Sequence, residues 1–303
     1  LVRVEAAALN YRDLLMIDNG MGGALSWPFT PGSDMAGILE AIGEGVEGFQ
    51  VGERVIGTFW HDWYDGRSQK LMARGGPLPG VLAEKVILEA CDLVRAPGRW
   101  SPVQAATLPC AGLTAWMALV EQGGLKAGQR VLVQGTGGVA LYAVQLAAAL
   151  GAETLVLSGD AEKIHKAQAL GAVHGILRDA HREWSDEVLR MTQGAGVDHV
   201  LELVGGDNLS QSLNALAPDG HVALVGLLGD MHIRAFTPDF IMRRARLQGI
   251  SVGPKRALEA LVRAVDSLGL EPVIAAEYPL HALRDALGHA RAGAFGKIVM
   301  RVD

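Results

Sequence analysis

Cysteine is scarce in this chain: only Cys91 and Cys110 occur among 303 residues, and neither belongs to a CxxC pair. Two cysteines cannot build a disulfide framework or a four-cysteine structural zinc site. Folding that depends on disulfides is typical of oxidising compartments. We therefore expect a cytoplasmic protein.

Basic clusters and long apolar runs are also missing. No block of Lys or Arg stands out, the net charge is −6 and the pI is about 5.9. This balance does not indicate binding to nucleic acid or to an anionic membrane surface. The longest apolar stretch that we identify, 139–150, is interrupted by Gln145 and is too short to span a bilayer. We expect no nucleic acid partner, no membrane partner and no transmembrane segment.

The composition is that of an ordinary globular protein, with 50% hydrophobic and 20% charged residues. A chain of 303 residues is long for one hydrophobic core and suits two domains. Leu1 lies inside an apolar-polar alternation without a methionine or a signal-type segment. We expect further residues before Leu1 in the complete protein.

The most informative pattern is a strand, a glycine turn, a helix and a second strand between Gln129 and Ser158. Gly135 permits the tight turn, Gly137 lets the backbone approach a pyrophosphate, and Ala140 is small enough for close packing of helix on strand. The N-terminus of the helix would bind the anion. The pattern predicts a dinucleotide site that includes Gly135, Thr136, Gly137, Gly138 and Val139.

The end of the second strand indicates which dinucleotide binds. An NAD site usually has Asp or Glu about 20 residues beyond the glycines, whereas this chain has Ser158 there. Ser158 and Gly159 leave room for a 2′-phosphate, and Lys163 would neutralise it. The sequence therefore favours NADPH. In the alternative, Asp160 binds a ribose hydroxyl and Lys163 is a solvated helix residue.

Hydrophobic periodicity predicts an α/β fold with a doubly wound parallel sheet. Short β-branched strands alternate with helices from about residue 131 to 252, whereas residues 1–110 carry short strands and many Gly/Pro turns, which indicates a mainly β, barrel-like domain. The closing strand, 297–302, has no partner in the parallel sheet and is expected to return to the first domain. We predict a discontinuous domain, 1–115 with 254–303, around a Rossmann domain, 116–253, and ligands in the cleft between them.

Two glycine segments follow the fourth and fifth strands of the predicted sheet. The carboxyl ends of such strands bind ligand, so these segments are expected to contact the cofactor, although their glycines would also serve as plain turn residues. The residues are Val204, Gly205, Val225, Gly226 and Leu227.

Four segments together resemble the medium-chain dehydrogenase/reductase superfamily, and within it the zinc-free quinone oxidoreductase branch that includes zeta-crystallin. They are ALNYRDLL, PFTPGSDMAGILEAIGEGVEGFQVGERVIG, ATLPCAGLTAW and FGKIVM. The resemblance spans essentially the whole chain in order. It implies a GroES-like barrel beside the Rossmann domain and a homodimer formed through the Rossmann domain.

The resemblance also bears on metal. Zinc enzymes of the superfamily hold their catalytic metal at three positions that are Asn10, Ser33 and Cys110 in this chain. Catalytic zinc needs three side-chain ligands, so we expect no metal, with Cys110 as a small buried hydrophobe. The nearest other cluster, His61 with Asp62 and Asp65, is expected to be a solvated loop.

Without zinc, the resemblance implies reduction of quinones or α,β-unsaturated carbonyls by hydride from NADPH, a reaction that needs only a hydrogen bond to the carbonyl and then a proton. It places Asn10 and Thr114 near the nicotinamide, with Ser251, Val252 and Lys297 lining that end.

The proton donor stays open between Tyr11 and water, and Tyr11 is equally well read as a core-edge tyrosine. Arg12 and Asp13 are expected to pair with each other or with neighbours. The alternatives for function are a zinc-free alcohol dehydrogenase and a non-catalytic NADPH-binding protein with a structural or RNA-binding role.

Overall fold

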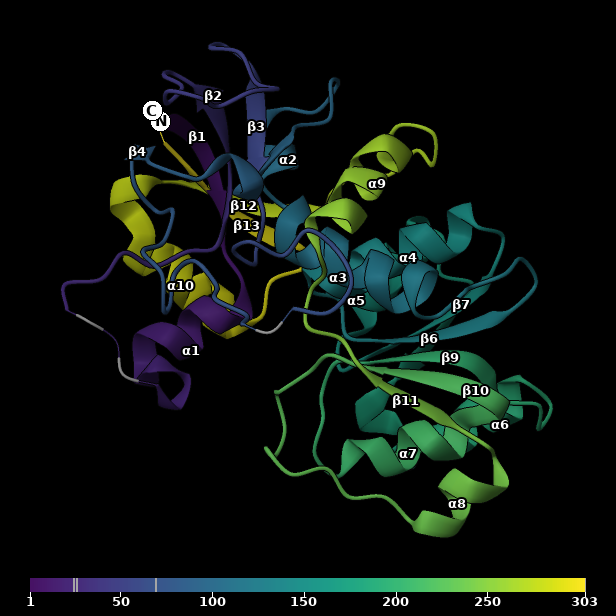
Figure 1. Cartoon of the computed structure of the whole chain (residues 1–303). Coiled ribbons are helices and arrows are strands. Elements are labelled where there is room, and N and C mark those ends of the chain that lie inside the picture. Colours follow the sequence, from purple (N-terminus) through teal and green to yellow (C-terminus); the bar gives the residue numbers. More distant parts are fainter. Residues whose placement is uncertain (24, 26, 69, 303) are drawn as a thin grey trace. The chain divides into compact units, whose positions relative to one another are not determined.

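The computed structural model describes residues 1–23, 25, 27–68 and 70–302, and its elements are labelled in Figure 1. The chain divides into two compact units. The first comprises Leu1–Leu113 and Val252–Asp303, and the second comprises Thr114–Ser251.

The first unit is built on a seven-stranded sheet in the order β12-β13-β1-β2-β3-β5, with β4 also paired to β1. Neighbouring strands are antiparallel except for β12 and β13. The alternation of residues in the first strand places Val2 and Val4 in a core with Met35 and Val55. The strands are β1 (Val2–Ala8), β2 (Asp34–Leu39), β3 (Arg54–Gly57), β4 (Lys85–Val86), β5 (Leu93–Arg95), β12 (Ile274–Pro279) and β13 (Lys297–Arg301).

The last strand of the sheet returns to the first one. β13 runs antiparallel to β1, with Ala7 opposite Met300, so residues nearly 300 positions apart are neighbours. The helices of this unit include α9, whose apolar spacing buries Leu258 and Leu261. They are α1 (Tyr11–Asn19), η1 (Gly20–Gly22), η2 (Ala90–Asp92), α2 (Pro102–Ala105), η3 (Leu108–Gly112), α9 (Lys255–Val265), η6 (Leu280–Ala282) and α10 (Leu283–Ala292).

The second unit is a six-stranded parallel sheet in the order β11-β10-β9-β6-β7-β8. This is the Rossmann order 3-2-1-4-5-6 when the strands are numbered along the unit. In Figure 1, α4 covers one face of the sheet and α7 the other. The strands are β6 (Arg130–Gln134), β7 (Glu153–Ser158), β8 (His174–Leu177), β9 (Val197–Glu202), β10 (Leu216–Leu224) and β11 (Arg246–Gly249).

The helices connect these strands, and the core lies between helices and sheet. Leu132, Leu155, Val200 and Val222 are fully buried there. The sequence did not predict β8, because this four-residue strand at the sheet edge carries His174 and Gly175 rather than an apolar run. The helices are η4 (Met117–Glu121), α3 (Leu113–Trp116), α4 (Gly138–Ala149), α5 (Ala161–Ala169), η5 (Arg178–Ala180), α6 (Trp184–Met191), α7 (Asn208–Ala215) and α8 (Thr237–Met242).

One continuous helical run is longer than the apolar stretch identified from the sequence. Pro102–Glu121, which includes two π-helical turns, has the length and apolar composition needed to cross a membrane. However, 72% of its apolar 18-residue window is buried inside the protein, as in a core helix. The expectation that 139–150 is the longest apolar segment was wrong because Thr107 and Thr114 interrupt the run in the sequence and are themselves buried.

Candidate active site

The glycine turn between β6 and α4 has the geometry of an anion site. Gly135 has a φ of +81°, which favours glycine, and its N–H pairs with Leu157 at 2.7 Å. Gly137 is the N-cap of α4, and no side chain caps that helix. A Cβ on Gly135 or Gly137 would meet no atom within 4 Å. The turn is therefore open beside free helical N–H groups, which fits a pyrophosphate. Thr136 is buried, Gly138 begins the helix, and Val139 follows it.

Asp160 has a structural role at the far end of β7. Its Oδ1 accepts the N–H groups of Glu162 at 2.9 Å and of Lys163 at 3.1 Å, so it is the N-cap of α5. Ser158 Oγ in turn accepts the N–H of Asp160 at 3.2 Å. Capping of α5 therefore explains the Asp160 carboxylate without a contact to a ribose hydroxyl.

An arginine that the sequence reading missed lies against the same strand end. A Cβ on Gly159 would lie 2.7 Å from Nη2 of Arg178. Arg178 follows directly after β8, which pairs with β7 so that Leu177 is opposite Ser158. Its Nε binds Asp179 at 3.0 Å. The guanidinium therefore reaches the strand end at which a dinucleotide 2′-phosphate would bind.

A buried carboxylate fixes the loop after β9. Glu202 is fully buried, and its Oε1 accepts the N–H groups of Val204 at 3.0 Å and of Gly205 at 2.8 Å. Its Oε2 accepts Nε2 of Gln134 at 3.1 Å and the hydroxyl of Ser212. This network ties the end of β6 to the end of β9. The sequence reading did not single out Glu202, whose partners come from other elements of the fold.

The glycines of the next two loops are explained by packing. A Cβ on Gly226 would lie 1.8 Å from the carbonyl oxygen of Leu203, and one on Gly205 would lie 2.8 Å from that of Gly226. The close approach of the two loops therefore requires glycine at both positions, and it explains these glycines without reference to a ligand. Val225 is half-buried, and Leu227 is exposed.

In the first unit, a buried ammonium group holds the start of α1. Nζ of Lys297, on β13, donates to Oδ1 of Asn10 at 2.6 Å and to the carbonyl oxygen of Leu9 at 2.5 Å. Nδ2 of Asn10 donates to Oγ of Ser33 at 3.2 Å. Two predicted site residues, Asn10 and Lys297, are thus in direct contact.

The same cluster continues through Asp34 to Cys110. Oγ of Ser33 donates to Oδ1 of Asp34 at 2.8 Å, and the N–H of Cys110 donates to Oδ2 at 3.0 Å. Burial raises the pKa of Asp34, while the Lys297 charge and these hydrogen bonds oppose the rise. Burial also raises the pKa of Cys110 far above its usual value. The three positions that the family resemblance matches to zinc ligands therefore carry an amide, a hydroxyl and a neutral thiol.

Arg12 and Asp13 do not pair with each other. Arg12 donates to the carbonyl oxygens of Arg74 at 3.0 Å and Gly76 at 2.8 Å. Asp13 is buried, and its Oδ2 accepts the N–H of Asn10 at 2.8 Å, whereas its Oδ1 has no partner among the described residues. Burial raises the pKa of Asp13 to about 6.

The remaining predicted residues differ in exposure. Tyr11 is 49% exposed. Thr114 is buried within α3 of the second unit. Ser251 ends the second unit, and Val252 begins the return segment with a φ of +56°, a strained value for a β-branched residue.

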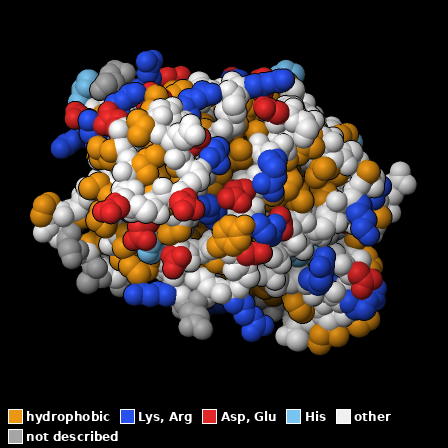
Figure 2. All heavy atoms as spheres, turned by 45° about the horizontal axis from the view of Figure 1, so that its top comes forward, with side chains coloured by type: hydrophobic (Ala, Val, Ile, Leu, Met, Phe, Trp, Pro, Cys, Tyr) orange, Lys and Arg blue, Asp and Glu red, His pale blue; other side chains and the backbone are white. Residues whose placement is uncertain are grey.

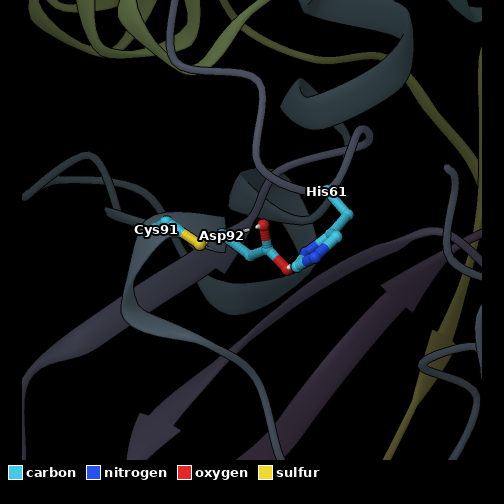
Figure 3. Close-up of side chains that lie close together, drawn as sticks. All are labelled: His61, Cys91 and Asp92. Carbon is cyan, nitrogen blue, oxygen red and sulfur yellow. Dashed lines mark hydrogen bonds and ion pairs between the residues drawn. The ribbon is translucent and has the colours of Figure 1, made fainter. Parts of the chain in front are cut away.

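His61 begins a loop in which Asp62 and Asp65 are exposed, while its own side chain is 27% exposed. Figure 3 shows its ring turned toward Asp92, with Nδ1 2.8 Å from Oδ2. Nη2 of Arg74 lies 2.7 Å from the same oxygen, and the N–H of Asp62 donates to Oδ1 at 3.0 Å. Burial would raise the pKa of Asp92, but these hydrogen bonds outweigh it and leave the pKa lowered.

Among the residues that the structure describes, His61, Cys91 and Asp92 form the one group with metal-ligating spacing. Both oxygens of Asp92 already accept hydrogen bonds, and the Arg74 guanidinium would repel a cation. Burial and nearby carboxylates raise the pKa of Cys91 to about 11, so its thiol is neutral. We therefore interpret these residues as a hydrogen-bonded cluster that joins the loops of His61 and Arg74 to Asp92.

Comparisons with known proteins agree with this architecture. The alcohol dehydrogenase GroES-like domain matches residues 1–98, and the zinc-binding dehydrogenase family matches residues 138–267. A zinc-type alcohol dehydrogenase-like protein of Schizosaccharomyces pombe is 36% identical over 313 residues, covering 100% of this chain and 90% of that protein. A quinone oxidoreductase of Lama guanicoe is 29% identical over 310 residues, covering 99% and 88%.

Solved structures give the same result. A protein of Sinorhizobium meliloti 1021, provisionally named as an alcohol dehydrogenase, superposes with a TM-score of 0.95 at 48% identity, covering 99% of this chain and 89% of that one. An NAD-dependent alcohol dehydrogenase gives 0.91 at 30% identity, covering 100% and 91%. The chain belongs to the medium-chain dehydrogenase/reductase superfamily and is an oxidoreductase of that type, which uses a nicotinamide cofactor.

The buried carboxyl of Asp13 predicts a specific pH dependence of stability. Its pKa is about 6 in the folded protein against 3.8 for a free side chain, so the folded state binds the proton more tightly. The stabilisation is present below about pH 4 and is lost as the pH rises through about 6, a change of up to about 3 kcal/mol. Asp13→Asn should remove this loss, as measured by denaturant unfolding from pH 4 to 8.

Asp18→Asn, on the exposed side of the same helix, is the control. Arg291 lowers the pKa of Asp18 through a hydrogen bond, so this variant should change the profile in the opposite sense. An Asp13→Asn profile parallel to that of the parent would contradict the raised pKa of Asp13.

Proposed function

We propose that this protein is an NADPH-dependent, metal-independent oxidoreductase that reduces quinones or α,β-unsaturated carbonyls. The observation that carries the proposal is the cluster at the three positions used for zinc by related enzymes. Asn10 and Ser33 are hydrogen-bonded to each other and to buried partners, and Cys110 is a neutral thiol. Catalytic zinc prefers thiolate, imidazole or carboxylate ligands, so this donor set does not fit it.

The proposed chemistry follows from a donor set that does not fit a metal ion. Oxidation of an alcohol needs a metal or a base to stabilise the alkoxide, whereas a conjugated carbonyl accepts hydride if its oxygen receives a hydrogen bond. A bound NADPH supplies the hydride. The amide of Asn10 is fixed on both sides by Lys297 and Ser33, so we assign it a positioning role. Tyr11, half-exposed beside it, or a water supplies the proton.

The second unit holds the cofactor in this proposal. The open turn at Gly135 and Gly137 receives the pyrophosphate, and the loop fixed by Glu202 lies at the carboxyl ends of the strands. The 2′-phosphate is recognised by Ser158, Lys163 and the newly identified Arg178. A guanidinium donates charge-assisted hydrogen bonds to a phosphate. NADH has no 2′-phosphate to accept them.

The role of Arg178 is testable by measuring both cofactors. Arg178→Ala should weaken NADPH binding by about 10-fold or more and leave the Kd of NADH nearly unchanged, because only NADPH carries the 2′-phosphate. Arg190→Ala is the matched control, since Arg190 is exposed in the same unit and pairs with Glu187. Equal affinities of the parent for NADPH and NADH would contradict the cofactor preference.

The activity itself is tested with a substrate panel. NADPH oxidation should be observed with enones and quinones and not with simple aldehydes, and a chelator should leave the rate unchanged. Elemental analysis should find well under one zinc per chain. Turnover of alcohols without enone reduction would instead support a zinc-free alcohol dehydrogenase, and loss of activity on chelation would overturn metal independence.

We propose a small-molecule substrate and no nucleic acid partner. Figure 2 shows Lys and Arg side chains intermixed with Asp and Glu over the face that it draws. Binding to a nucleic acid backbone depends on a concentrated basic surface. The intermixed charges and the net charge of −6 give no support to the RNA-binding alternative.

We further propose that the second unit forms a homodimer. β11 lies at the edge of its sheet, and Arg246, Gln248 and Gly249 are exposed. An unpaired edge strand is a template for pairing with another chain. Large apolar side chains are exposed in the segment that leads to this strand, namely Met231 at 75%, Phe236 at 65%, Ile241 at 63% and Met242 at 75%.

Light scattering tests the dimer. The parent should have a mass about twice the 32.0 kDa of one chain, and Ile241→Lys with Met242→Lys should shift it toward the monomer because two charges would be buried. The double variant Val51→Lys with Ile87→Lys, at exposed apolar positions of the first unit, is the control. A monomeric parent would exclude the proposal.

A further inference from the structure

We propose that Arg12 binds the carbonyl oxygen of the substrate and stabilises the negative charge that develops there, the task that zinc performs in metal-dependent relatives. The inference rests on the proposed function, because it assigns the electrophilic group of that reaction. Three features of the first unit support the proposal. They are the orientation of the guanidinium, the anchoring of the loop that orients it, and the position of Arg12 close in sequence to Asn10, which belongs to the hydrogen-bonded cluster that reaches Cys110.

The guanidinium of Arg12 is held in one orientation. Nη1 and Nη2 donate to the carbonyl oxygens of Arg74 and Gly76, and the group lies 5.2 Å from the centre of the Phe59 ring. An arginine has five N–H donors. These two bonds are the ones that Arg12 makes among the described residues, so three of its five donors have no partner there.

The loop that orients Arg12 is itself anchored. The side chain of Arg74 binds the buried carboxylate of Asp92 at 2.7 Å, and the same carboxylate holds His61 (Figure 3). A backbone hydrogen bond anchors the same loop, because the N–H of His61 donates to the carbonyl oxygen of Met72 at 2.9 Å. Asp92 therefore fixes the carbonyl groups that fix Arg12. Preorganised donors of this kind stabilise developing charge without reorganisation.

Position and charge also point to Arg12. Arg12 lies in the first turn of α1, two residues after Asn10, and its neighbour Asp13 accepts the N–H of Asn10 at 2.8 Å. Two further cations lie nearby. Lys297 is nearly fully buried and donates to Leu9 and Asn10, and Arg74 forms an ion pair with the buried carboxylate of Asp92. Arg12 has no carboxylate partner among the ion pairs of the described residues, so we assign it the substrate oxygen.

The proposed reaction needs no metal ion. A bound NADPH would supply the hydride by breaking its C4–H bond and becoming NADP⁺. The new C–H bond forms at the β-carbon of the substrate, the C=C π pair becomes a π bond between the α-carbon and the carbonyl carbon, and the C=O π pair moves onto oxygen. The resulting enolate oxygen accepts N–H hydrogen bonds from Arg12, which keeps its protons. The α-carbon then takes a proton from Tyr11 or water while the carbonyl group re-forms, and the tyrosinate or hydroxide that remains takes a proton from solvent.

The test compares two arginines that bind backbone in the same way. Arg12→Ala should lower kcat for an enone by about 10²–10³-fold, the cost of losing an oxyanion donor, with little change in the Kd of NADPH. Arg54 also bridges two carbonyl oxygens, those of Gly98 and Trp100, but belongs to the sheet. Arg54→Ala should cost stability and leave kcat within about threefold of the parent.

Two further readouts separate catalysis from structure. Guanidinium at millimolar concentration should restore part of the Arg12→Ala rate, whereas the same concentration of urea should not. Arg12→Lys should retain partial activity that declines toward pH 10, because a lysine titrates near 10.4 and an arginine does not; this variant also serves if Arg12→Ala does not fold.

The inference is overturned if a folded Arg12→Ala keeps its kcat, or if its loss equals that of Arg54→Ala and guanidinium restores nothing. A parent protein that reduces neither enones nor quinones would refute the proposed function instead. The two failures are therefore distinguishable in one set of assays.

Discussion

The ammonium group of Lys297 is the interaction on which the candidate site depends. It is nearly fully buried, and burial of a charge is costly unless the charge is paired and hydrogen-bonded. Here the carbonyl of Leu9, the amide of Asn10 and the nearby charge of Asp34 provide the compensation. These contacts join β13 to the junction of β1 and α1. The positions of Asn10, Ser33 and, through Asp34, Cys110 all follow from them.

Features set by local pattern could be read from the sequence. The glycine turn after β6, the alternation of parallel strands with helices, and the apolar stripe of α9 each depend on residues close together in the chain. The return of the last strand was also predictable, since 297–302 had no partner among the predicted parallel strands. β8 was not, because its residues carry no strong strand signal and its place is given by β7 and α5.

Contacts between distant residues were beyond the sequence reading. Arg178 reaches Gly159 because β8 lies beside β7, and Asp92 meets His61 and Arg74 because three separate loops converge. Arg12 and Asp13 were expected to pair with each other or with neighbours, and the structure selects the neighbours, with Asp13 bound to Asn10 and Arg12 to the loop at Gly76. In each case the tertiary fold determines the partner.

The place of Lys297 has a consequence for the order of assembly during synthesis. Leu9 and Asn10 leave the ribosome among the first residues described, but their ammonium partner follows only after the entire Thr114–Ser251 unit. Until then β1 lacks its β13 neighbour and presents an unpaired edge. The nucleotide-binding half can fold before the other half is finished. A chain that stops short of β13 would therefore retain a complete dinucleotide fold and lack an ordered first motif.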